Sequence, residues 1–144
     1  MSTLSERIDT IERGYEYLLA YAAQGRRDDT GSEVRQTLSA MHAALDGLAT
    51  AVAECLNSAN SANSASSANL AAPEAALCAP EATTQDAAAF IDAVIDDSRK
   101  ARGAIALVLS RPAISSLLVD NLNASIHLRA LLTDVFLVDQ ALKP

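Results

Sequence analysis

The two histidines, His42 and His127, are the first residues to test for chemistry, because imidazole serves both as a metal ligand and as a general base. Metal sites inside helical bundles combine glutamates with a Glu-x-x-His motif, whose two side chains share one helix face. Here Ser39 precedes His42 by three positions and Ala124 precedes His127 by three, so neither histidine completes that motif. The Cys-x-x-Cys-His motif of haem attachment is missing as well. We therefore expect no metal and no cofactor.

The two cysteines, Cys55 and Cys78, are the candidate nucleophiles. Nucleophilic catalysis requires a hydroxyl or thiol beside a base that a third group orients. Cys55 falls on the apolar stripe of a predicted helix, which is typical of a small core residue. Cys78 falls in a predicted linker, where no cationic neighbour would activate its thiol. With no glycine-rich phosphate loop either, the sequence predicts no catalytic residue and two free thiols.

Two polar residues, Ser98 and Asn121, occupy core positions in the third and fourth predicted helices. Counted outward from the turn between those helices they lie at similar depth, so they could face each other across one layer. One interpretation is a hydrogen-bonded polar layer that fixes helix register. The other is the floor of a small polar pocket that binds a ligand.

His127 and Tyr15 complete the candidate ligand-binding residues. His127 lies at the edge of the apolar stripe, one heptad from both Asp120 and Asp134. A heptad spans about 10 Å along a helix, too far for direct pairing, so the sequence favours a packed or half-solvated histidine. Tyr15 lies on the apolar stripe of the first predicted helix.

The charge of the chain excludes some partners. The formal net charge is -7, whereas nucleic-acid binding requires a concentrated basic face. The densest basic spots, 26–27 and 99–102, lie beside the acidic pairs 28–29 and 96–97, which favours solvated ion pairs. The N-terminus lacks a basic start followed by an apolar run, and no apolar run approaches the ~20 residues that span a bilayer. We expect a cytoplasmic protein with no nucleic-acid or membrane partner.

The composition favours helices. Alanine makes up about a fifth of the 144 residues, tryptophan is absent, and phenylalanine and tyrosine together number five. Two helices are predicted at about 3–24 and 32–56, each opened by a capping box, Thr3 with Glu6 and Thr30 with Glu33. Their apolar residues recur in alternating steps of four and three, as in coiled coils.

Ser-Ala-Asn triplets dominate the next segment, which offers little to bury and predicts a flexible linker at about 57–82. Two further helices are predicted at about 84–109 and 112–142, separated by the Ser-Arg-Pro turn at 110–112. The predicted core stripe of the last helix is Ile114, Leu117, Asn121, Ala124, Leu128, Leu131, Val135, Val138 and Leu142. The sequence thus predicts a single all-α domain, an antiparallel four-helix bundle made of two hairpins joined by the linker.

The outer face of the last predicted helix carries too many apolar residues for a monomer. If the core stripe faces inward, the opposite face holds Val119, Leu122, Ile126 and Leu137, interrupted by Arg129 and Thr133. We expect a homodimer through this face, with another protein or the 70–77 segment as the alternative cover.

The absence of catalytic groups and the surplus of apolar surface predict a non-catalytic cytoplasmic adaptor or regulator that acts through protein–protein association. The alternative is a small-molecule-binding bundle with a polar pocket between the third and fourth predicted helices, near Tyr15, Ser98, Asn121 and His127.

Overall fold

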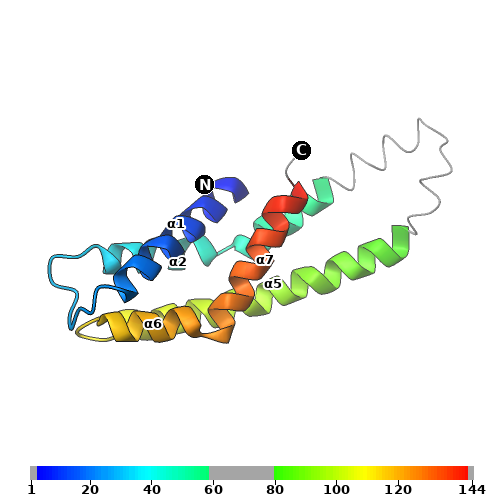
Figure 1. The fold of residues 1–144 in the computed structure, drawn as a ribbon. Coiled ribbons are helices and arrows are strands. Elements are labelled where there is room, and N and C mark those ends of the chain that lie inside the picture. Colours follow the sequence, from blue (N-terminus) through cyan, green and yellow to red (C-terminus); the bar gives the residue numbers. More distant parts are fainter. Residues whose placement is uncertain (1–2, 59–79, 143–144) are drawn as a thin grey trace.

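The protein is all-helical, as predicted. A computed structural model describes residues 3–58 and 80–142, with only the backbone described at 80–84. The regular structure of these ranges is helical throughout (Figure 1). Its helices are α1 (Leu4–Ala22), α2 (Val34–Leu45), an unlabelled helix at 48–58, α5 (Pro80–Leu109), α6 (Ser116–Ala124) and α7 (Ile126–Leu142). The predicted four-helix bundle is not confirmed, because the described ranges form six helices and two of the four predicted ones are divided.

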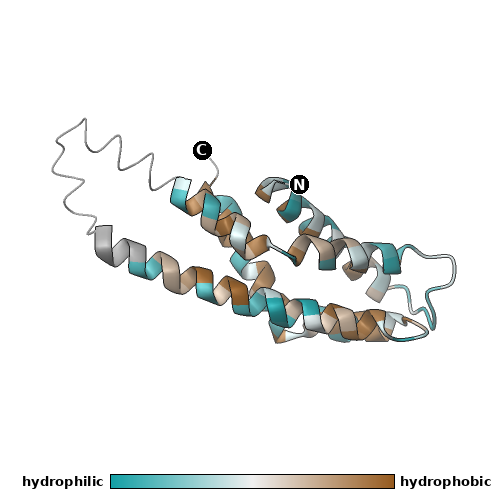
Figure 2. Cartoon of the chain, turned by 180° about the vertical axis from the view of Figure 1, so that it is seen from behind, coloured by the Kyte–Doolittle hydropathy of each residue, from teal (hydrophilic) through white to brown (hydrophobic). Residues whose placement is uncertain are grey.

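The helices pack in two groups that meet along α2 and α5. α1 packs against α2 and α6, while α5 packs against α7 and α2. α6 runs back along α5, and α7 then turns away from the direction of α6 (Figure 1). Hydrophobic and hydrophilic residues alternate along the helices, as amphipathic packing requires (Figure 2).

The first helix begins where the sequence predicts. The Thr3 amide donates to Glu6 Oε2 at 2.7 Å and the Glu6 amide donates to Thr3 Oγ1 at 3.2 Å, so both halves of the capping box are present. The second predicted box is wrong, because α2 starts at Val34 with Glu33 at its N-cap position and no side-chain cap.

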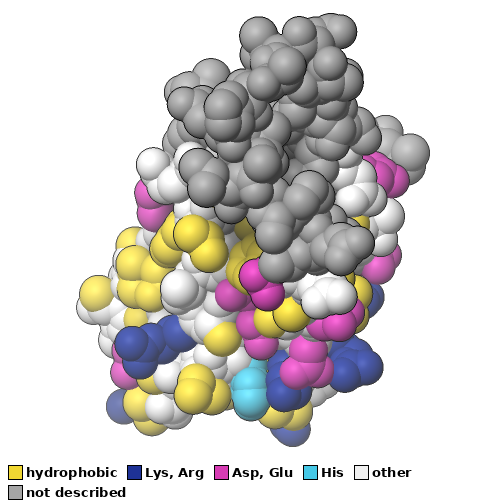
Figure 3. Space-filling view, turned by 90° about the vertical axis from the view of Figure 1, so that its right-hand side faces the viewer, with side chains coloured by type: hydrophobic (Ala, Val, Ile, Leu, Met, Phe, Trp, Pro, Cys, Tyr) yellow, Lys and Arg dark blue, Asp and Glu magenta, His cyan; other side chains and the backbone are white. Residues whose placement is uncertain are grey.

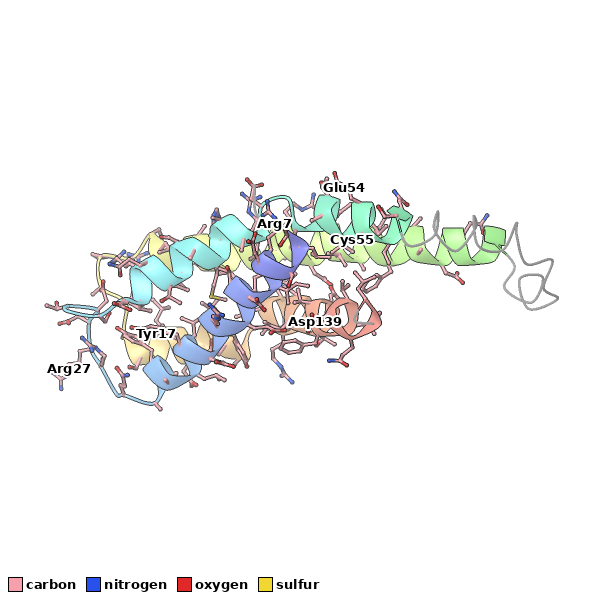
Figure 4. The ribbon with its side chains drawn as sticks, turned by 90° about the horizontal axis from the view of Figure 1, so that it is seen from above. Arg7, Tyr17, Arg27, Glu54, Cys55 and Asp139 are labelled. Carbon is pink, nitrogen blue, oxygen red and sulfur yellow. The ribbon has the colours of Figure 1, made fainter. Side chains whose placement is uncertain are left out.

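The second predicted helix is divided at Gly47, whose φ of +78° is the left-handed conformation that glycine adopts without steric cost. Arg7 of α1 stabilises the break, since its guanidinium donates to the carbonyl oxygens of Ala44, at 3.1 Å, and Asp46. A cation at the C-terminal end of a helix also interacts favourably with the helix dipole. Figure 4 shows Arg7 beside the gap between α2 and the following helix.

The fourth predicted helix is divided at Ser125, whose ψ of 128° lies outside the helical range. The break shifts the buried face. α6 buries Val119 and Leu122 in place of the predicted Leu117 and Asn121, both of which are exposed. From Leu128 onward the predicted stripe holds, with its members buried or, at the C-terminal end, half-buried.

Hydrogen bonds join the connection between α1 and α2 to the connection between α5 and α6. We call the bonds between residues 21–35 and 109–116 the loop clasp. The buried Tyr21 hydroxyl donates to the Ile114 carbonyl at 2.6 Å, and burial raises the pKa of this phenol. Ser116 Oγ donates to the Tyr21 carbonyl at 2.7 Å and accepts from the Arg26 amide at 2.8 Å. The Ser116 amide also donates to the Arg26 carbonyl, at 2.9 Å.

An ion pair completes the loop clasp. Arg35 Nε lies 2.7 Å from Asp29 Oδ2, and the Ile114 amide donates to Asp29 Oδ1 at 2.9 Å. These two donors, with Ile114 the stronger, hold the pKa of the Asp29 carboxyl below its ordinary value. The same guanidinium donates to the carbonyl oxygens of Leu109, Arg111 and Pro112.

The predicted linker at 57–82 lies mostly outside the described residues. At its borders the helix that begins at 48 continues to 58, and α5 begins at Pro80, ahead of the predicted start near 84. Across 3–58 and 80–142, no helix combines the length and apolarity needed to cross a bilayer.

Candidate functional site

A groove with a volume of about 510 Å³ lies between α1 and α7. Its lining consists of four residues from α1 and three from α7: Glu12, Tyr15, Glu16, Leu19, Phe136, Asp139 and Gln140. Figure 4 shows Asp139 on α7 next to α1, on the opposite side of the ribbon from Glu54. The groove is therefore built by residues more than a hundred positions apart in the sequence.

The α1 wall follows directly from helix geometry. Residues 12, 15, 16 and 19 are spaced by three, four and seven positions, so they share one face of the helix. Leu18, which neighbours this face, is fully buried, and Tyr15 packs against the core while one part of it lines the groove. The core thus fixes the rotation of α1 that presents this wall.

The α7 wall is positioned in the same way. Phe136, Asp139 and Gln140 lie three and four positions apart, while the neighbouring Val135 and Val138 are 2% and 4% exposed. Burial of these valines fixes the rotation of α7. Phe136 itself remains 45% exposed, a large fraction for a phenylalanine.

The groove combines an apolar floor with an acidic rim. Leu19 and Phe136, 47% and 45% exposed, give it apolar surface together with the Tyr15 ring. All three charged residues in its lining, Glu12, Glu16 and Asp139, are acidic. On the face that Figure 3 shows, acidic side chains likewise lie among hydrophobic patches, with several basic side chains beside them. This chemistry suits a ligand with an apolar body and a positive charge, which carboxylates and aromatic rings both attract.

Of the four predicted ligand-binding residues, Tyr15 is the one that lines this groove. Ser98 is buried on α5, and its hydroxyl has no hydrogen-bond partner in the described part of the chain. Asn121 and His127 are exposed. The predicted layer of Ser98 with Asn121 is wrong, because the break at Ser125 turns Asn121 outward and buries Asn123 instead.

The predicted interface residues separate into two sets. Val119 and Leu122 are 0% and 5% exposed, so they belong to the core and the prediction that they face outward is wrong. The physical reason is again the break at Ser125, which gives α6 a different buried face from α7. Ile126, Arg129 and Leu137 are exposed, as predicted, with Ile126 at 73%.

Other potential chemistry is sparse in the residues described. Ranges 3–58 and 80–142 contain no group of three or more His, Cys, Asp and Glu residues placed to hold a metal ion. Cys55 is a free thiol, half-buried against the core, and Cys78 lies outside the described residues.

Sequence reasoning missed six of the seven groove residues. The spacing of Glu12, Tyr15, Glu16 and Leu19 beside the core stripe is a readable signal of a mixed acidic and apolar face. Nothing in the spacing tells which helix lies opposite, and α7 is placed there by the turn at Ser125.

No family model, no curated protein and no solved structure matches the chain.

Proposed function

We propose that this chain is a cytoplasmic, non-catalytic helical adaptor or regulator that binds a basic amphipathic segment of a partner protein in the groove between α1 and α7. The observation that carries the proposal is the union of an exposed apolar floor and an all-acidic rim in one groove. Amphipathic helices are recognised by such grooves, their apolar residues entering the floor while their charges meet the rim.

Charge complementarity argues for a basic occupant. The whole chain carries a net charge of -7, and the three charged groove residues have the same sign. An acidic segment would be repelled by these carboxylates, and a purely apolar segment would cover them without adding a favourable charge contact of its own. The positive charge of a lysine- or arginine-bearing segment is attracted both by the carboxylates and by the aromatic rings of the floor.

A small organic cation is the alternative ligand, because about 510 Å³ also lies in the size range of small-molecule sites. The polar pocket between the third and fourth predicted helices has less support, since Ser98 is buried and Asn121 is exposed.

Fluorescence anisotropy with a labelled amphipathic lysine–leucine peptide tests the proposal, with the glutamate–leucine peptide of the same pattern as the control probe. We expect the lysine peptide to bind and the glutamate peptide not to bind. Phe136→Ala should weaken binding about tenfold, because it removes the exposed aromatic anchor. Glu16→Gln should weaken it about two- to fivefold, with a smaller loss at high salt.

Matched variants distinguish binding in the groove from attraction by the net negative charge of the protein. Leu117→Ala truncates another exposed apolar residue, 69% exposed, and Glu54→Gln removes another exposed carboxylate. Neither should change the affinity. Equal effects of Glu16→Gln and Glu54→Gln would mean that the peptide senses only net charge, and the groove proposal would fail. Tight competition by a small aromatic ammonium compound would favour the alternative ligand.

The homodimer is a separate part of the proposal. Its support is the exposed set Ile126 and Leu137 on α7, since large apolar side chains on an outer helix face are typical of association. The burial of Val119 and Leu122 reduces the face that such a contact can use.

A further inference from the structure

Two carboxyl groups meet where α5 contacts α7, outside the groove. Asp97 of α5 lies within hydrogen-bonding reach of Asp134 of α7. Asp134 Oδ2 is buried, and no donor reaches it from the described part of the chain. Two ionised carboxylates cannot hydrogen-bond and repel each other, whereas one shared proton turns the contact into a strong hydrogen bond. Burial, reinforced by the neighbouring Asp97, raises the pKa of Asp134 to about 7.

The remaining charged groups of the surrounding helices are placed elsewhere. On α5, Asp96 pairs with its neighbours Arg99 and Lys100, and Arg102 pairs with Asp46. Arg7 of α1 donates to a carbonyl oxygen at the end of α2, and Glu12, Glu16 and Asp139 line the groove. The other described charged side chains of α1, α5, α6 and α7 lie at exposed positions: Glu6, Asp9, Arg13, Asp86, Asp92, Asp120, His127 and Arg129. Asp97 is accordingly the charged group that acts on Asp134 within the described residues.

We propose that the Asp97–Asp134 pair is a proton-operated latch that holds α7 against α5 while one proton is shared and loosens α7 when that proton is lost. The groove wall begins two residues later on the same helix, at Phe136. Loosening of α7 therefore disturbs the groove. The link to ligand binding rests on the proposed function, whereas the latch itself does not.

The direction of the pH effect follows from proton linkage. In the unfolded chain an aspartate has a pKa of about 3.9. The folded protein keeps the proton of Asp134 up to about pH 7. Between these values the folded state binds more protons, so stability falls as pH rises from about 4 to about 7, with no further loss from this group above that range.

Thermal unfolding across pH tests the latch. The Asp134→Asn variant places an amide that donates to Asp97 at every pH, so its contact stays closed. We expect the melting temperature of the unmodified protein to fall by roughly 5 °C relative to Asp134→Asn between pH 5 and pH 8. Both proteins keep His42 and His127, so the difference between their profiles isolates the carboxyl pair. Asp120→Asn, which removes an exposed carboxylate, should follow the unmodified profile.

Hydrogen exchange and peptide binding at pH 8 give the second readout. Amides of 134–142, corrected for intrinsic exchange, should exchange faster in the unmodified protein than in Asp134→Asn. The lysine–leucine peptide should bind Asp134→Asn about threefold more tightly, although the variant has lost a negative charge. Charge alone predicts weaker binding.

Three outcomes decide the latch. Parallel unfolding profiles for the unmodified protein and Asp134→Asn would overturn it, as would equal exchange in α7. If the profiles diverge but no variant binds the peptide, the latch stands and the proposed function fails.

Discussion

Gly14 of α1 and Met41 of α2 lie so close that a methyl group on Gly14 would overlap Cγ and Sδ of the methionine. Met41 is fully buried, so it has little room to move aside. Gly14 is thus required for the close contact of α1 with α2, and that contact supports the helix that carries the groove floor.

Replacing Gly14 with alanine should destabilise the protein by about 1–3 kcal/mol, because overpacking outweighs the gain in helix propensity. Gly103 is the matched control, since it lies in α5 with open space where its Cβ would be. Gly103→Ala should stabilise by about 0.5–1 kcal/mol. Urea unfolding measures both, and stabilisation by both variants would contradict the close α1–α2 contact.

The loop clasp predicts a contrast between two neighbouring tyrosines. Tyr21→Phe should cost about 1–3 kcal/mol, because it leaves the buried Ile114 carbonyl without its donor. The Tyr17 hydroxyl accepts from the exposed Glu33 amide, which water can satisfy. Tyr17→Phe should therefore change stability by less than about 0.5 kcal/mol. Equal losses in thermal unfolding would show that the clasp bond contributes nothing specific.

The shift of buried face at Ser125 can be tested with three leucines. Leu45→Ala and Leu131→Ala should each cost about 2–5 kcal/mol, since these side chains are 2% and 0% exposed. Leu117→Ala should stay within about 0.5 kcal/mol, because Leu117 is 69% exposed although the uninterrupted heptad pattern places it in the core. A loss of stability for Leu117→Ala comparable to that for Leu131→Ala would mean that the helix is not broken at Ser125.

Self-association through α7 is tested by light scattering behind size exclusion. A protein that pairs through this face should have twice its chain mass at tens of micromolar, and Ile126→Asp should return it to the mass of one chain, because the interface would bury an unpaired charge. Circular dichroism checks that the variant stays folded, as expected for a position that is 73% exposed. A single-chain mass for the unmodified protein would refute the homodimer.

Local signals in the sequence predicted much of the fold. The capping box of Thr3 with Glu6 and the stripe from Val34 to Val52 involve residues three or four positions apart, and both are confirmed. The same holds for the ion pairs of Asp96 with Arg99 and Lys100. Such interactions depend on helix periodicity alone.

Interactions between distant segments could not be predicted in this way. The break at Gly47 is stabilised by Arg7, which lies some forty positions earlier, and the loop clasp joins residues about ninety positions apart. The break at Ser125 has no glycine or proline to mark it, yet it turns α7 so that Phe136 and Asp139 lie opposite Tyr15. The groove therefore depends on tertiary packing that the heptad pattern does not contain.

Chemical-shift mapping with the isotope-labelled protein and the lysine–leucine peptide tests most directly whether the α1–α7 groove is the binding site. Binding in this groove predicts that the largest shift changes fall on the amides of Tyr15, Leu19, Phe136 and Gln140, and that they shrink in Phe136→Ala. Changes concentrated on the exposed side of α6 around Leu117, or spread evenly over all acidic surfaces, would contradict it.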